Sequence, residues 1–191
     1  MLEKFIDYTY QIFPTIDTNI KNGIKDLMKQ FDTTKPNWFS RPLDILSQGD
    51  ILENIPFSYT NQDGEEVTFI TKGMILSNTC DMTRDEYIMI APFIPFNHDF
   101  KEETMLNIKN NIISGKMCLT NCYLDNYYID FSRSSSFVRN IIVDLYKKGK
   151  IKRIHSLSQF GFYFLCSKIA VYYLRVENYD NFNSRSKEIF M

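Results

Sequence analysis

The sequence predicts an α+β fold in which a strongly twisted antiparallel sheet or a small barrel is flanked by N-terminal and C-terminal helices. Near both ends of the chain, apolar residues recur at three- and four-residue steps, the period of a helix. Between them, from Gly49 to about Asp130, short β-branched and aromatic runs alternate with turn residues, as strands do. We expect a helical segment at 1–34, one α+β domain at 35–176 with a barrel-like core at about 48–130, and a polar tail at 177–191.

The first segment is predicted to form two helices separated by Pro14, each with an apolar stripe. Residues 33–47 contain two prolines and no clear period, so they are expected to be a connector. Trp38 and Phe39 lie within it, and we expect these two aromatic residues to anchor it to the core.

The middle of the chain is predicted to hold five or six strands. The strand-sized runs are 49–57, 66–70, 73–77, 87–93, 116–124 and 127–130. Asp63-Gly64 is a typical turn sequence between the first two. Residues 101–113 interrupt the series with helix-like spacing, which predicts a short inserted helix.

Two helices are expected in the C-terminal third. The first would begin at a serine cap near Ser134 and stop at Gly149. The second would begin at Ser156 or Ser158 and run to Leu174, and its apolar residues on most sides predict that it packs in the core.

Composition narrows the function classes. The chain has 191 residues, a formal net charge of -1 and two histidines, so it has no global basic field for nucleic acid and little scope for histidine-based metal sites. The longest apolar stretch, Phe160 to Leu174, is shorter than a membrane helix and contains Lys168. No secretion signal is recognised at the start, so we expect a cytoplasmic protein with four reduced cysteines.

The run Ser77 to Asp81 places polar side chains directly after a strand. Such groups either fix a turn or line a site, so Ser77 and Asn78 are candidate lining residues, and Cys80 and Asp81 are candidate catalytic residues. Against a nucleophilic role, a neighbouring carboxylate raises a thiol pKa, and a base would have to come from elsewhere. A structural turn is the alternative.

The other cysteines give weaker signals. Cys118 and Cys122 have a spacing that zinc sites allow, but in a strand they would lie about 13 Å apart, and only a turn at Thr120-Asn121 would bring them together. A second close pair is absent from the sequence, so no metal site is predicted. Cys166 is expected to be a small core residue.

Five cations fall within residues 147–153 and form a candidate nucleic-acid site. They are Lys147, Lys148, Lys150, Lys152 and Arg153. Such a cluster can neutralise phosphates, but at the end of a helix it also complements the helix dipole. The sequence contains no phosphate-binding loop, dinucleotide fingerprint or standard hydrolase motif, and we expect no cofactor.

Residues 48–96 resemble the PemK/MazF family. The resemblance rests on Gly49-Asp50-Ile51, on the strand from Lys72 to Asn78 and on the strand from Tyr87 to Phe93. It implies an SH3-like barrel, and most members of the family are toxin endoribonucleases. The Ser-x-x-Cys-Asp strand end at Ser77–Asp81 is also similar to a sister group of uncharacterised prokaryotic proteins, often found in phage, plasmid or defence contexts.

The chain departs from the family pattern at three positions. Lys72 stands where the family has its catalytic arginine, Gly73 where a proline follows it, and Ile94 where it has a threonine. Lysine lacks the bidentate fork of arginine, and isoleucine has no hydroxyl to position or move a proton.

These departures favour a non-catalytic binding or regulatory module of a bacterial or phage conflict system, of the toxin–antitoxin or phage-defence kind. The alternative is a toxin-type RNA-binding protein or endoribonuclease, in which Lys72 would be catalytic. A cysteine-dependent enzyme using Cys80 is a third class. The expected partner is another protein or a second copy of the chain, with RNA as the alternative and no membrane.

Overall fold

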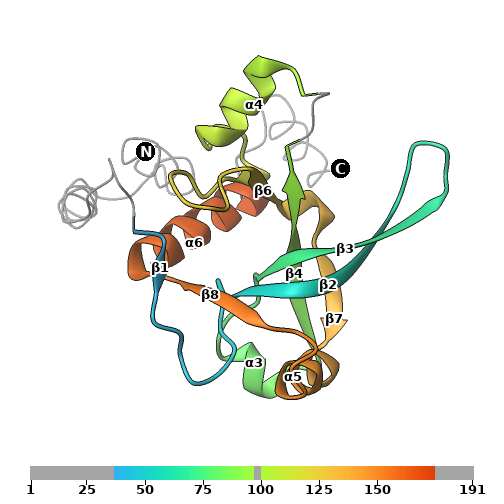
Figure 1. Ribbon diagram of the computed structural model, residues 1–191, viewed down its shortest axis with the longest axis vertical. Helices are drawn as coiled ribbons and strands as arrows, with labels where there is room; N and C mark the ends of the chain where they lie inside the picture. Colours follow the sequence, from blue (N-terminus) through green and yellow to red (C-terminus); the bar gives the residue numbers. More distant parts are fainter. Residues whose placement is uncertain (1–36, 97–99, 175–191) are drawn as a thin grey trace, which may run out of the picture.

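The structure is a computed structural model that describes residues 37–96 and 100–174 (Figure 1). Within these residues the chain forms a sheet with helices packed around it. The predicted α+β class, with an antiparallel sheet and a C-terminal helix, is confirmed. The two helices predicted in residues 1–34 and the tail predicted at 177–191 lie outside the described residues.

The sheet of the described residues has eight strands, is not closed into a barrel, and has antiparallel ladders. The strand order is β1-β8-β2-β3-β4-β6-β5, and β7 also pairs with β4. The strands are β1 (Phe39–Ser40), β2 (Ile51–Thr60), β3 (Glu66–Ile75), β4 (Tyr87–Pro95), β5 (Lys116–Met117), β6 (Tyr127–Asp130), β7 (Ser135–Val138) and β8 (Arg153–Leu157). β4 is central, because it pairs with β3, β6 and β7 along different parts of its length.

The sheet extends beyond the predicted core at 48–130. β7 occupies the serines expected to cap a helix, and Val138 is the N-cap of α5 (Arg139–Lys147) instead. β8 lies where no strand was predicted, and β3 is one strand where two were expected.

The predicted strand at 116–124 is wrong after Met117. The side chain of Asn111 takes both backbone hydrogen-bonding groups of Cys118, at 2.8 and 3.0 Å, so these groups are not available to a ladder. Asn121, with a φ of 58°, then turns the chain.

The helices agree more closely with the sequence. They are α3 (Asp81–Arg84), α4 (Glu102–Lys109), α5, α6 (Gln159–Leu174) and the 3₁₀ turn η1 (Phe131–Arg133). α4 is the predicted inserted helix. Gly149 follows α5 with a φ of 70°, as expected of a glycine that ends a helix. No helix in the described part of the chain is long and apolar enough to cross a membrane.

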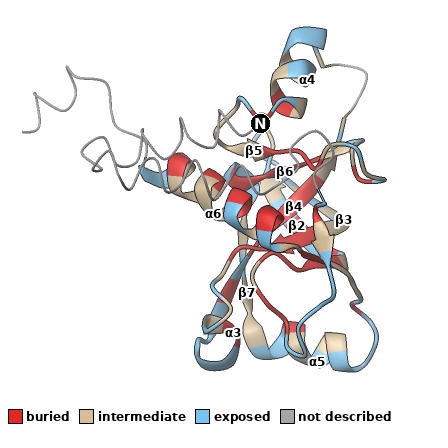
Figure 2. Cartoon of the chain, turned by 90° about the vertical axis from the view of Figure 1, so that its left-hand side faces the viewer, coloured by how far each residue is buried: buried red, intermediate tan, exposed pale blue. Residues whose placement is uncertain are grey.

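The main core lies between α6 and the sheet, where buried residues of both gather (Figure 2). Trp38 is 2% exposed, its ring packs 5.3 Å from that of Phe160 and 5.6 Å from that of Phe164, and its indole N–H donates to the Thr120 carbonyl at 2.7 Å. The predicted anchoring of the connector by Trp38 is therefore confirmed.

The β2–β3 hairpin projects from the body of the sheet (Figure 1). We call residues 55–71 the arm. A register shift between Leu52 and Ile55, with Asn54 at a φ of 61°, marks its base. At its tip, the Asn61 side chain accepts hydrogen bonds from the Asp63 and Glu65 amides, and Gly64 takes a φ of 82°. The predicted Asp63-Gly64 turn is confirmed.

Candidate functional site

A groove opens where β3 and β4 separate. Their ladder consists of Gly73–Pro92, Met74–Ala91 and Ile75–Ile90, and it ends at Pro92, which has no amide hydrogen. Beyond this point residues 93–95 of β4 pair with β6 instead. The Thr71 hydroxyl bridges the opening by donating to the Phe93 carbonyl at 2.8 Å.

This arm groove has a volume of about 420 Å³. Its lining is Tyr59, Val67, Phe69, Ile70, Thr71, Phe93, Ile94, Pro95, Tyr127 and Arg133. Pairing of Tyr59 with Val67 and of Phe57 with Phe69 places the apolar side chains of both arm strands on one face. On that face Phe57 is buried, but Tyr59, Val67 and Phe69 are only partly buried, and Ile70 on the opposite face is 70% exposed. The groove is therefore a surface of mostly half-buried apolar and aromatic side chains.

Cations lie against the aromatic rings of the groove. The Arg133 guanidinium is 4.6 Å from the centroid of the Tyr59 ring, and the Lys72 ammonium is 4.6 Å from that of Tyr127. Both distances are within the range of cation–π contacts. The groove thus combines stacking surfaces with positive charge, although Asp63 and Glu65 at the arm tip add negative charge nearby.

Asp130 organises the end of the groove. Its buried carboxylate accepts from the Ser132 amide at 3.1 Å, caps η1, and lies 3.9 Å from the Arg133 guanidinium. The same carboxylate binds the Lys116 ammonium at 2.6 Å. The pKa of neighbouring Tyr128 is raised by burial and by the negative charge of Asp130, so its phenol stays protonated. Arg133 is therefore presented by a fixed turn.

The predicted turn residues lie away from the arm. Ser77 accepts from the Met89 amide at 2.8 Å, and Asn78 accepts from the Cys80 amide at 2.9 Å. Asp81 pairs with Arg84 at 2.8 Å, which also raises the pKa of that arginine. Cys80 is exposed at the start of α3. Three of these side chains therefore have partners within or beside the turn.

His155, the histidine within the described residues, packs among aromatic rings and does not line the arm groove. The ring of His155 stacks on Phe39 at 4.2 Å and lies 5.3 Å from Tyr123, and burial lowers its pKa. His98 is outside the described residues.

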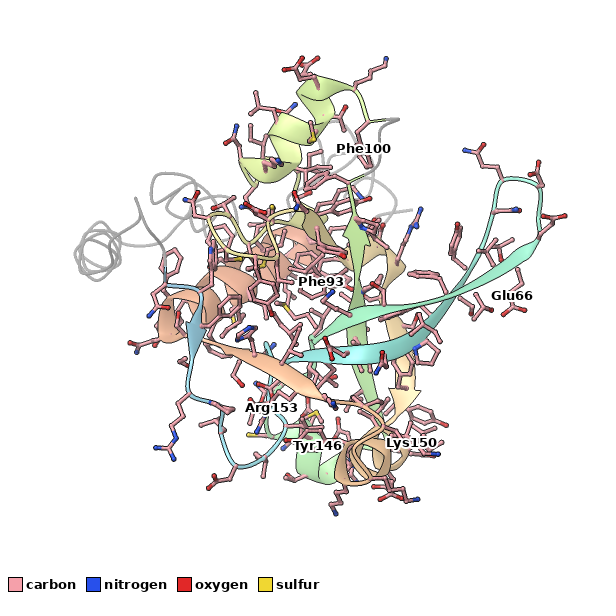
Figure 3. All side chains as sticks on the ribbon, viewed as in Figure 1. Glu66, Phe93, Phe100, Tyr146, Lys150 and Arg153 are labelled. Atoms are coloured by element: carbon pink, nitrogen blue, oxygen red, sulfur yellow. The ribbon has the colours of Figure 1, made fainter. Side chains whose placement is uncertain are left out.

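The predicted cation cluster divides into two groups. Lys147, Lys148, Lys150 and Lys152 are exposed. Arg153, whose side chain is 9% exposed, binds the fully buried Asp50 carboxylate at 2.9 Å and donates to the carbonyls of Leu43 and Ile45 at 2.8 Å each. Figure 3 shows Lys150 and Arg153 at the end of the molecule opposite to α4, with Glu66 on the separate arm.

Cys118 and Cys122 lie on either side of the turn at Asn121, but both are thiols that donate to carbonyls, of Tyr127 and Leu119. Burial raises the pKa of Cys118 to about 12 and also raises that of Cys122. Thiolates are the zinc-binding form, so this environment opposes ligation. Among the described residues, no group of three His, Cys, Asp or Glu side chains is placed to hold a metal ion.

Lys72 and Ile94 stand where the PemK/MazF family has its arginine and threonine. Lys72 lies beside the groove against Tyr127, and Ile94 lines it. The other groove residues Tyr59, Tyr127 and Arg133 were not predicted from the sequence. A local signal for Arg133 was present, because Asp130 followed by Ser132 is a capping pattern. Nothing in the local sequence indicates that this turn faces the arm.

Comparison with known proteins finds only distant structural similarity. No family model matches the chain, and no curated protein matches it. Two crystal structures of MazE-MazF from Deinococcus radiodurans align with it at 8% sequence identity. One covers 68% of this chain and 96% of its own with a TM-score of 0.39, and the other covers 70% and 99% with a TM-score of 0.38.

Proposed function

We propose that the chain is a non-catalytic binding or regulatory module of a bacterial or phage conflict system, and that it binds a protein partner through the arm groove. The class of system is inferred from the resemblance of residues 48–96 to the PemK/MazF family. The cytoplasm is the proposed location.

The observation that carries the proposal is the dispersal of the chemical groups. Lys72 lies against Tyr127 beside the groove, whereas Asp81 and Cys80 belong to the α3 turn. Ile94, which also lines the groove, is an aliphatic residue at the position of the family's threonine. Among the described residues, the three candidate catalytic side chains therefore do not meet at the groove, while a partly buried apolar face is available for binding.

RNA binding through the same groove is the second candidate function. It is favoured by the cations that flank partly buried aromatic rings, Arg133 with Tyr59 and Lys72 with Tyr127. Single-stranded nucleic acids bind to such surfaces by stacking, which contributes about 1–3 kcal/mol per base, and by phosphate contacts. Of the exposed lysines at 147–152, Lys150 lies away from the arm (Figure 3), and these lysines would form a separate site.

Fluorescence anisotropy with labelled single-stranded RNA separates these two candidates. A protein-binding module predicts no binding near 50 mM salt, or weak binding that Arg133→Glu leaves unchanged. RNA binding in the groove predicts a loss of roughly tenfold or more in Arg133→Glu. Lys150→Glu is the matched control, because it makes the same charge change at the lysine cluster. A loss in Lys150→Glu alone would assign RNA to that cluster and contradict a role for the groove.

A further inference from the structure

A second pocket lies between residues 44–46, α3 and α5. It shares no lining residue with the arm groove. Its volume is about 370 Å³, a size at which proteins hold small molecules. Ile45, Leu46, Met82 and Val143 give it apolar walls. It is therefore a pocket of small-molecule size rather than an extension of the groove.

The walls of this pocket are fixed by two arginines. Arg153 holds the Leu43 and Ile45 carbonyls and is itself bound to buried Asp50, which secures the 44–46 wall. Arg139 at the start of α5 donates to the Asp85 and Met82 carbonyls at 2.5 and 3.3 Å, which joins α5 to α3. The pocket is preformed, so binding would not have to order its walls.

The pocket has one lysine among its lining residues. Lys147 is a lining residue, and Lys148, Lys150 and Lys152 follow it in the chain, all exposed. Among the described residues none of these lysines forms an ion pair. Three other residues with polar groups line the pocket: Asp44, which is exposed, Thr83, whose hydroxyl donates to the Cys80 carbonyl at 3.0 Å, and Tyr146, whose ring centroid lies 5.7 Å from the Arg153 guanidinium. Within the lining, Lys147 is matched by one carboxylate, Asp44, and the other three lysines follow Lys147 in the chain without lining the pocket.

We propose that this pocket binds a small amphiphilic anion, an aromatic or aliphatic body that carries one carboxylate, sulfonate or phosphate group. The apolar body would contact Ile45, Leu46, Met82 and Val143, and the anionic group would bind Lys147 at the rim. This ligand class matches both features of the pocket, because apolar walls alone would accept a neutral molecule and lysines alone would accept any anion.

Two dyes with the same ring system test the charge preference. Fluorescence titration of the full chain would compare 8-anilinonaphthalene-1-sulfonate with neutral N-phenyl-1-naphthylamine. We expect the sulfonate to bind about two- to fivefold tighter, as for an exposed charge pair. Lys147→Gln should abolish this preference, and Lys148→Gln, the matched control on the same helix end, should keep it. Equal binding of the two dyes, or a preference that survives in Lys147→Gln, would overturn the proposal.

Methionine methyl NMR locates the bound dye. The Met82 methyl signal, assigned with Met82→Leu, should shift on addition of the sulfonate, whereas those of Met89 and Met117 should not. Val143→Phe, which fills the pocket, should weaken binding tenfold or more, and Ile141→Phe on the exposed face of the same helix should not. Binding without a Met82 shift would place the dye elsewhere and contradict the proposal. No arm residue or RNA enters these measurements, so their result is independent of the proposed function.

Discussion

Replacing Arg153 with methionine is expected to lower the free energy of unfolding by about 3–5 kcal/mol. The reason is the buried carboxylate that would remain. Asp50 is 0% exposed, and it also accepts from the Ser47 amide at 2.9 Å and from the Ser156 hydroxyl at 2.5 Å. These neutral donors would not replace the cation, and the Leu43 and Ile45 carbonyls would lose their partner as well.

Urea unfolding at neutral pH measures this cost. Lys152→Met is the control, because Lys152 is the neighbouring cation, is exposed and forms no ion pair among the described residues. It should change the free energy of unfolding by no more than about 0.5 kcal/mol. Equal effects of the two substitutions would contradict the division of the cation cluster into one structural arginine and four surface lysines.

Gly73→Ala is expected to lower the free energy of unfolding by about 1–3 kcal/mol, because the added methyl group would overpack the core. A Cβ atom at Gly73 would lie 2.6 Å from Ile90 Cγ2 and 3.2 Å from atoms of Ile55 and Phe57. Gly73 also forms the last β3–β4 pair before the groove. The glycine therefore permits the close approach of strands from which the groove opens.

A double-mutant cycle tests this explanation. Ile90→Ala removes the clashing atom, so its cost should be smaller in the Gly73→Ala background than in the native chain. The coupling should exceed about 0.5 kcal/mol, the limit within which independent sites are additive. Additive losses would show that the clash with Ile90 is not the cause.

Some elements were predictable because their signals are local. The turn at Asn61–Glu65, helix α6 and the stop at Gly149 each follow from neighbouring residues. β7 and β8 were not predicted, because their strand character depends on pairing with distant β4 and β2. The predicted strand does not continue after Met117, because the Asn111 side chain binds the backbone amide and carbonyl of Cys118 that a strand ladder would use.

In the candidate site, too, some residues have a local sequence signal and others are placed only by tertiary structure. Lys72 was identified from a motif, and the strand alternation of the arm follows from its sequence. The contact of Arg133 with Tyr59 could not be foreseen, because it depends on η1 lying beside the arm, which starts at the register shift around Asn54. Likewise, the five cations look equivalent in sequence, and only tertiary structure buries Arg153 against Asp50.

The most direct test of binding without catalysis is incubation of the purified protein with end-labelled single-stranded RNA, followed by gel separation of the products. We predict that the RNA stays intact at an excess of protein over many hours. RNA fragments that form with the native chain and disappear with Lys72→Ala would contradict this, because they would show that Lys72 supports cleavage without the family's arginine and threonine. Fragments formed equally by both proteins would indicate a contaminating nuclease, which repurification would remove.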